Sequence, residues 1–372
     1  MSQDDHSNHS TQSNERQQAT VHKMNGHFFE DLSVGQELVH GVPRTITESD
    51  ATLYLALTGN RFALHSAQTI AQAVGFKSMP LDNLLVFHIA FGKTVNDISL
   101  NAVANLGYAE VLFHQPCFAG DTIKVISKVI GTKENSNGKT GIVYVHSTAF
   151  NQNNQLVVEW KRWVMLKKYD PKNTVDLAII PSLEETANRD NQTLAKQIDF
   201  SNWELSDSDN QLTFSQINEG DIFNHRDGMT INDSDHSLAT RLYQNNARVH
   251  FDQTLMNDAP HGKRLVYGGH VISICRALSY NGLGNSIWLS AINGGTHSNP
   301  SFAGDTIYCE TRVLKKFDIA ERNDIGLVRL QMLGIKNQSP EKIETLYEEM
   351  NGRKKYHSDV VLDLDYCALM IK

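Results

Sequence analysis

Residues 116–123 of this chain read PCFAGDTI, and residues 300–307 repeat them as PSFAGDTI. A second pair lies upstream, where ITESD at 46–50 returns as INDSD at 231–235. The offset between the copies is 185 residues for the upstream pair (46 to 231) and 184 residues for the downstream pair (116 to 300). A spacing kept this closely over about seventy residues indicates two copies of one fold.

A histidine and an asparagine belong to the same repeat. His65 stands fifteen residues after the Asp that ends ITESD, and His250 stands fifteen residues after the Asp that ends INDSD. Asn60 and Asn245 each precede the histidine of their copy by five residues. Because the two copies share this framework, the differences between them indicate which copy carries out chemistry.

Composition places the chain among globular proteins. Its 372 residues are enough for two domains, and 40% of them are hydrophobic and 20% charged. The net charge of −8 argues against a nucleic-acid surface, which needs a concentrated basic face. No stretch approaches the roughly 20 apolar residues of a membrane span, and the N-terminus lacks the apolar segment of a signal peptide. We therefore expect a cytoplasmic protein without membrane or nucleic-acid partners.

The four cysteines show no paired short spacing, and they lie within apolar runs. This pattern favours buried, reduced thiols over a disulfide framework or a zinc site, so no metal is expected. The four residues are Cys117, Cys275, Cys309 and Cys367.

Four segments are predicted along the chain. Residues 1–25 are mostly polar, with almost nothing to bury, and are predicted to be disordered. Residues 26–170 form the first copy and residues 203–372 the second. The polar stretch 171–202 is predicted to link them.

Within each copy, helical periodicity comes before strand periodicity. The Ser-Asp pair at 49–50 and again at 234–235 is predicted to cap a helix, and a helical stretch then carries the Asn and the His. A longer helix follows, with apolar residues at helical spacing in the second copy. These residues are Val271, Ile274, Cys275 and Leu278.

Strands rich in β-branched and aromatic residues follow the long helix. They are predicted at 122–130, 140–150 and 155–166 in the first copy and at 306–314, 325–335 and 360–370 in the second. The charged insertion at 337–357 lengthens one hairpin connection of the second copy. One long helix wrapped by an antiparallel sheet is an α+β architecture.

The order of these motifs resembles the MaoC-like hydratases of the hot-dog fold, and two copies in one chain would make a double hot dog. The resemblance covers nearly everything from residue 28 onward. Four stretches are similar, more specifically, to the mesaconyl-CoA hydratase family, also called β-methylmalyl-CoA dehydratases. They are NAVANLGYAE at 101–110, ATRLYQN at 239–245, LVYGGHVIS at 265–273 and LDLDY at 362–366.

The resemblance implies reversible addition of water to an α,β-unsaturated acyl-CoA thioester, with mesaconyl-CoA as the expected substrate. That reaction needs a base for the water, an acid for the α-carbon and dipoles that hold an enolate-like oxygen. A histidine with a pKa near neutrality suits the proton transfers, so His250 is expected to be the sole acid/base group. Many relatives carry Asp where this chain has Asn245. An amide cannot exchange protons at neutral pH, so Asn245 is expected to position the water.

The second copy is expected to be the catalytic one. Its long helix begins at Tyr267, Gly268 and Gly269, where free backbone N–H groups could hold the thioester oxygen. The matching stretch of the first copy, MPLDN at 79–83, has no glycine, and Asp82 would repel a developing oxyanion. The first copy is then expected to accommodate the CoA or the acyl group.

Several polar residues have a structural interpretation beside the functional one. His65 is interpreted as a core or surface residue, and His270 either assists the glycine pair or packs at the helix start. Asp252 either orients His250 or is a surface charge. Three cations are candidates for the CoA phosphates or the free carboxylate of mesaconyl-CoA, with surface solvation as the alternative. They are Arg248, Lys263 and Arg264.

Two other functions stay open. One is hydration of another short enoyl-CoA, and the other is an acyl-CoA thioesterase or a binding module that has lost catalysis. Thioesterases of this fold generally use a carboxylate near the thioester, whereas the motif positions here hold Asn and His. No cofactor is expected, since CoA is part of the substrate. The chain is expected to form a homodimer.

Overall fold

The computed structural model describes residues 26–173, 178–187, 194–350 and 352–372. The segment 1–25, predicted to be disordered, lies outside the described residues. The other positions outside them are 174–177 and 188–193, which belong to the predicted linker, and residue 351.

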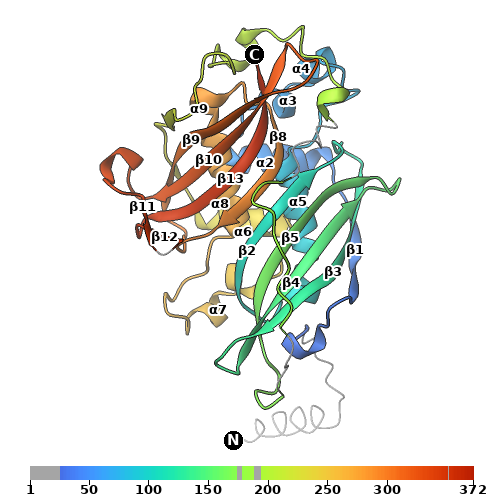
Figure 1. Ribbon diagram of the computed structural model, residues 1–372, viewed down its shortest axis with the longest axis vertical. Coiled ribbons are helices and arrows are strands. Elements are labelled where there is room, and N and C mark those ends of the chain that lie inside the picture. Colours follow the sequence, from blue (N-terminus) through green and yellow to red (C-terminus); the bar gives the residue numbers. More distant parts are fainter. Residues whose placement is uncertain (1–25, 174–177, 188–193, 351) are drawn as a thin grey trace, which may run out of the picture.

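One continuous antiparallel sheet is formed by both halves of the chain, with the strand order β1-β3-β4-β5-β2-β8-β13-β10-β9-β6 and β7 paired to β9. In the first half the strands are β1 (Glu37–Thr45), β2 (Ala102–Phe113), β3 (Thr122–Glu134), β4 (Thr140–Phe150) and β5 (Leu156–Lys167). In the second half they are β6 (Ile222–Asn224), β7 (Met229–Thr230), β8 (Trp288–Thr296), β9 (Thr306–Asp318), β10 (Ile325–Lys336) and β13 (Val360–Ile371). The halves join where β2 pairs with β8, in the middle of the sheet (Figure 1).

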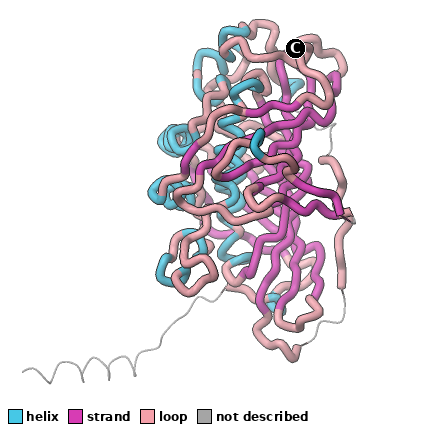
Figure 2. The backbone as a smooth tube through the Cα atoms, turned by 90° about the vertical axis from the view of Figure 1, so that its left-hand side faces the viewer, coloured by secondary structure: helices cyan, strands magenta, loops and turns pink. Residues whose placement is uncertain are grey.

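Two eleven-residue helices, α5 (Asn83–Lys93) and α8 (Gly268–Leu278), are the central helices of the two halves. Figure 2 shows the helices gathered on one side of the sheet. Every residue of α5 is buried, and so is every residue of α8 after Gly268. Along β5, buried and partly exposed residues alternate with the two-residue period of a strand that has one face against the core. These features make the α+β double hot-dog fold, as predicted.

The repeated PxFAGDTI motif joins a turn to the start of a helix in both halves. Gly120 and Gly304 have φ angles of 98° and 96°, which favour glycine. Their N–H groups donate to the carbonyls of Ile46 and Ile231, each over 2.8 Å. The repeat therefore encodes one hydrogen-bonded junction, built twice.

The predicted helix caps are wrong by two residues. The helix α2 (Glu48–Thr58) is capped by Thr47, and Asp50 completes a capping box at its third position. Its counterpart α6 (Asp233–Leu242) has Asn232 as N-cap residue, whose N–H and Nδ2 donate to the Asp235 carboxylate over 3.4 and 2.7 Å. The Ser-Asp pairs therefore lie inside the first helical turn, where their negative charge is favourable.

The stretch that carries the Asn and His is mostly loop, not the predicted helix. His65 lies in the four-residue α3 (Ala63–Ser66), and His250 ends the 3-10 turn η5 (Arg248–His250). A short helix, α4 (Gln68–Ala73), follows in the first half, and α7 (Gln253–Met256) follows in the second. The insertion forms its own hairpin, β11 (Tyr347–Met350) with β12 (Arg353–Tyr356).

The described part of the linker packs against both halves. Ile179 bridges to Thr132 at the end of β3, and the N–H of Ala187 donates to Asn293 in β8 over 2.9 Å. The remaining short elements are the 3-10 turns η1 (Phe29–Asp31), η3 (Leu194–Lys196), η4 (Leu205–Ser208) and η6 (Pro340–Lys342), the π-turn η2 (Val95–Ser99) and α9 (Tyr280–Leu283). The four cysteines are buried thiols, as predicted. In the described part of the chain, the helices are too short or too polar to cross a membrane.

Candidate active site

Two side-chain hydrogen bonds help to hold the loop that ends at His250. The Oδ1 atom of Asn245 accepts from the N–H of Ala247 over 3.0 Å. The Nδ1 atom of His250 lies 3.0 Å from the carbonyl oxygen of Leu265. Because a carbonyl only accepts, this bond requires the proton on Nδ1 and leaves Nε2 with its lone pair. Within the described residues, neither Nε2 of His250 nor Nδ2 of Asn245 has a hydrogen-bond partner.

His250 is only partly exposed, and this burial affects its charge. Burial lowers the pKa of His250 to about 4, nearby His236 contributes in the same direction, and the bond to Leu265 opposes them. The expectation of a pKa near neutrality is therefore not met in the free protein. At neutral pH the imidazole is uncharged, which is the form that accepts a proton from water.

The N-terminus of α8 lies beside His250. Tyr267 is the N-cap residue, its ring centroid is 5.5 Å from that of His250, and no side chain caps the helix. A Cβ atom on Gly269 would lie 2.4 Å from the Tyr267 ring, and one on Gly268 would lie 2.4 Å from the His297 ring. Neither position therefore has room for a side chain. The first N–H groups of α8 are donors without an internal partner.

The first half repeats this geometry with one decisive change. Oδ1 of Asn60 accepts from the N–H of Phe62 over 2.8 Å, and Nδ1 of His65 lies 3.2 Å from the carbonyl oxygen of Pro80. These contacts match those of Asn245 and His250 one for one. At the position of Tyr267, however, the first half has Asp82, whose carboxylate caps α5.

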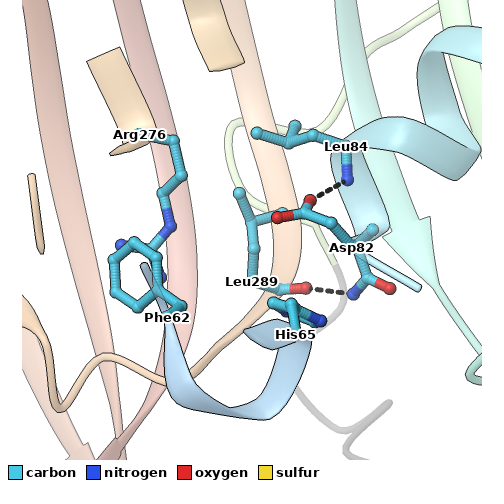
Figure 3. A pocket seen from close by; sticks show the side chains of 7 residues that line it. Phe62, His65, Asp82, Leu84, Arg276 and Leu289 are labelled. Carbon is cyan, nitrogen blue, oxygen red and sulfur yellow. Dashed lines mark hydrogen bonds between the residues drawn. The ribbon is translucent and has the colours of Figure 1, made fainter. Parts of the chain in front are cut away.

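Asp82 occupies the donors that stay free in the second half. Its Oδ1 accepts from the N–H of Leu84 over 2.7 Å, and its Oδ2 accepts from Nδ2 of Asn60 over 2.5 Å. Figure 3 shows the carboxylate turned toward Leu84, with Arg276 and Phe62 across the pocket. The cavity that remains is about 10 Å³, room for one water molecule at most.

Comparison with known proteins identifies the family. The family model for mesaconyl-CoA hydratase matches residues 5–344. The beta-methylmalyl-CoA dehydratase of Chloroflexus aurantiacus is 46% identical over 93% of this chain and 97% of its own length. The mesaconyl-CoA hydratase of Cereibacter sphaeroides is 43% identical over 93% of this chain and 98% of its own length. The chain belongs to the mesaconyl-CoA hydratase family.

Solved structures agree with this membership. A MaoC domain protein dehydratase from Chloroflexus aurantiacus superposes with a TM-score of 0.87 at 43% identity, covering 95% of this chain and 99% of that one. A Mycobacterium tuberculosis protein with a double hot-dog fold superposes with a TM-score of 0.73 at 24% identity, covering 92% and 98%, and supports the fold alone. As a member of the mesaconyl-CoA hydratase family, the protein is a hydro-lyase.

The predicted cations of this hydratase differ in how free they are. Nη2 of Arg264 lies 2.6 Å from both carboxylate oxygens of Asp233, and Nη1 donates to Ser237 over 2.9 Å, so this side chain is neutralised. Arg248 and Lys263 are exposed. Arg248 lies in the same short turn as His250.

Asp252 and His270, each with a structural and a functional interpretation from the sequence, have structural surroundings that the structure defines. Asp252 caps α7 by accepting from the N–H of Leu255 over 3.0 Å, and it is Leu265, not Asp252, that holds Nδ1 of His250. His270 is buried at the start of α8 and lines a separate cavity of about 220 Å³ with Asn232 and Asp235. No set of three His, Cys, Asp or Glu residues suited to a metal is found in the described ranges.

The sequence reasoning missed two residues beside the glycine pair. His297 follows β8, and its ring lies against Gly268. Desolvation lowers its pKa to about 4, with a further contribution from His250. His88, on α5 of the other half, reaches Gly269 and shares a hydrogen bond of 3.0 Å with Ser273. Neither belongs to the repeated motifs, so no signal in the repeat could have found them.

Proposed function

We propose that this hydro-lyase interconverts mesaconyl-CoA and β-methylmalyl-CoA at the site in its second half. The observation that carries the proposal is the set of free groups at the start of α8. The Nε2 lone pair of His250, the Nδ2 amide of Asn245 and the first N–H groups of α8 all lack protein partners there. In the first half the carboxylate of Asp82 occupies the equivalent amide and N–H groups.

The substrate follows from the relatives and from the chemistry of the groups. The two curated relatives are named for mesaconyl-CoA and β-methylmalyl-CoA. The amide Nδ2 of Asn245 donates to the oxygen of a water molecule, and Nε2 of His250 accepts one of its protons. The water oxygen then bonds to the β-carbon of the enoyl thioester while the double-bond electrons move toward the thioester oxygen.

The backbone of α8 holds the charge that develops in this step. The N–H groups of Gly268 and Gly269 donate to the enolate-like oxygen, where the positive end of the helix dipole lies. The imidazolium of His250 then delivers its proton to the α-carbon, which regenerates the neutral base. Oxygen and hydrogen arrive from the side of one residue, so the addition is syn. The reaction needs no cofactor besides the CoA of the substrate.

Exposed Arg248 and Lys263 are the cations available for the CoA phosphates, because Arg264 is engaged by Asp233. Thioester hydrolysis is disfavoured because two carboxylates of this half already have partners. Asp252 caps α7, and Asp233 accepts from Arg264. Neither carboxylate is free to activate water in the manner of a hot-dog thioesterase.

The test is incubation of the purified protein with mesaconyl-CoA. Hydration removes the conjugated ultraviolet absorbance and leaves the thioester intact. Hydrolysis releases a free thiol, which a thiol reagent detects. Loss of absorbance without thiol release supports the proposal. Thiol release at the same rate as the loss of absorbance would refute it, and absence of any reaction with a panel of short enoyl-CoA esters would refute it as well.

A further inference from the structure

Arg162 is a buried cation without a counter-charge. It lies on β5 of the first half, and its side chain is 1% exposed. All three of its guanidinium nitrogens are buried without a hydrogen-bond partner in the described part of the protein. The guanidinium carbon lies over the ring of Phe91, 4.5 Å from its centroid. Such a group is costly to bury unless an anion pairs with it.

The position of Arg162 links it to the candidate active site. Tyr108 on β2 pairs directly with Arg162, and the same tyrosine pairs with Gly295 on β8. Directly paired residues of an antiparallel sheet face the same side, and both Arg162 and Tyr108 are buried. The ring of Tyr108 lies 6.0 Å from that of His297.

Tyr267 connects Arg162 to the candidate active site from the side of α8. It is the N-cap residue of α8 beside His250, and its ring lies 6.3 Å from the ring of Phe91, which contacts the guanidinium of Arg162. Burial lowers the pKa of Arg162 to about 10, so the guanidinium is still a cation at neutral pH. The ring of Phe91 therefore links Arg162 to Tyr267 at the candidate active site.

Two other unpaired donors belong to the same face of the sheet as Arg162. The hydroxyl of Tyr108 and Nε1 of Trp160 are also buried without partners among the described side chains. Trp160 is two residues before Arg162 on β5, so both side chains face the same side of the sheet. A cation on the same sheet face as two unpaired neutral donors is suited to a carboxylate, which accepts from a guanidinium through both oxygens.

The other half shows that the fold can satisfy a buried arginine. Arg276 on α8 is 4% exposed and lies over the Phe62 ring beside Asp82. Its Nη1 donates to Ser279 and Ser286 over 3.1 and 2.9 Å, and its Nη2 donates to the carbonyl of Ser286. The closed site at Asp82 is thus lined by an arginine of the second half whose terminal nitrogens are hydrogen-bonded, whereas Arg162 of the first half has no such bonds among the described residues.

We propose that Arg162, with the hydroxyl of Tyr108, binds the free carboxylate of a dicarboxylic mono-thioester, and that the first half thereby selects the substrate of the second. The inference rests on the proposed function, because mesaconyl-CoA carries such a carboxylate on its β-carbon. In a thioester held at the start of α8, this carboxylate is attached to the second carbon atom beyond the carbonyl. In the proposed pose, the carboxylate points toward Tyr267 and Arg162.

The experiment compares two ligands that differ only at this group. Mesaconyl-CoA and E-2-methylbut-2-enoyl-CoA have the same carbon skeleton, with a carboxylate in one replaced by a methyl in the other. Their dissociation constants are measured by calorimetry in the His250→Ala background, which prevents turnover. We expect mesaconyl-CoA to bind about thirtyfold or more tightly, because a buried charge pair is lost in the methyl analogue. Adding Arg162→Met should reduce this preference to within about threefold.

Two controls keep the outcome decisive. Lys161→Met removes a positive charge from the next residue of β5, whose side chain pairs with Glu110, and should leave the preference unchanged. Arg162→Met should melt no lower than the parent protein, because the free guanidinium makes no hydrogen bond that is lost. Equal binding of the two ligands by the parent, a preference that survives Arg162→Met, or unfolding of Arg162→Met would each overturn the inference.

Failure of the proposed function would look different. A protein with wild-type His250 that hydrates no enoyl-CoA contradicts the assigned reaction, whatever the binding preference. A protein that hydrates mesaconyl-CoA but shows no role for Arg162 in the preference contradicts only the carboxylate site.

Discussion

The two halves of the molecule place an asparagine and a histidine in the same backbone setting and differ at the start of the long helix. In the first half Asp82 caps α5 and takes the amide of Asn60 as well. In the second half Tyr267 stands there, and both kinds of donor stay free. A carboxylate inside the chain therefore fills the place that, in the other half, is proposed for water and the thioester oxygen. The comparison teaches that duplication kept the scaffold while a single side chain closed one of the two sites.

The comparison is tested most strongly by removing each histidine in turn. His250→Ala should reduce the hydration rate by about a hundred- to ten-thousand-fold, the usual contribution of a general acid/base. His65→Ala, the matched variant of the first half, should leave most of the rate, since Asp82 already closes that site. The measurement is kcat/KM on mesaconyl-CoA. A larger loss in His65→Ala than in His250→Ala would exchange the roles of the halves.

A second test compares how much each of the two asparagines contributes to the hydration rate. Asn245→Ala should slow hydration by about a hundredfold, which is typical for the loss of one donor in an active site. Asn60→Ala should leave the rate nearly unchanged, because its amide is bound to Asp82. Initial rates of both variants, with circular dichroism as the check on folding, decide the matter. Equal rates for Asn245→Ala and wild type would remove the proposed water-positioning role.

The pH dependence sharpens the assignment of His250. Because burial lowers its pKa to about 4, the imidazole is protonated only as the pH falls through that value. The rate should therefore be nearly constant from pH 6 to 8, where a histidine of ordinary pKa would lose activity on the acid side. Asn245→Asp places a negative charge near His250, should raise its pKa, and should bring an acidic limb into this range. A wild-type profile that already falls to half near pH 6.5 would contradict a neutral, buried base.

Particular residues show how much of the fold could be predicted from the sequence. The repeat, the long helix at Gly268 and the strands β3, β4, β5, β9, β10 and β13 follow from periodicity and turn chemistry, which are local. Strands β2 and β8 were not predicted, because glycines such as Gly107 and Gly295 disfavour a strand assignment. Gly295 is needed there since a Cβ atom would lie 2.3 Å from the Tyr108 hydroxyl. That contact joins the two halves and has no signature in the sequence around either residue.

The site was predictable to a similar degree. Asn245, His250 and the glycine pair were expected in one site; the structure places His250 and the glycine pair beside Tyr267, and Asn245 holds the loop that ends at His250. Arg264 looked equally available in the sequence, but its neutralisation depends on Asp233, thirty-one residues away. Arg162 sits in an ordinary alternating strand, where a partner or its absence cannot be read. Long-range pairing of charges is what the sequence alone did not show.

The smallest expected effect concerns the residue that closes the first half. Asp82→Ala removes the cap of α5 and the bond to Asn60, and N-cap replacements by alanine cost about 1 kcal/mol. The variant should therefore unfold at a lower denaturant concentration, while kcat/KM on mesaconyl-CoA stays within about twofold of wild type, because the site in the second half is untouched. Asp252→Ala is the matched control: it removes a cap of the same kind from α7, close to His250. If closing the first half is the role of Asp82, only its stability contribution should be measurable. A large loss of turnover in Asp82→Ala, without a comparable loss in Asp252→Ala, would mean that the first half takes part in the reaction and that the division of labour drawn from the two caps is wrong.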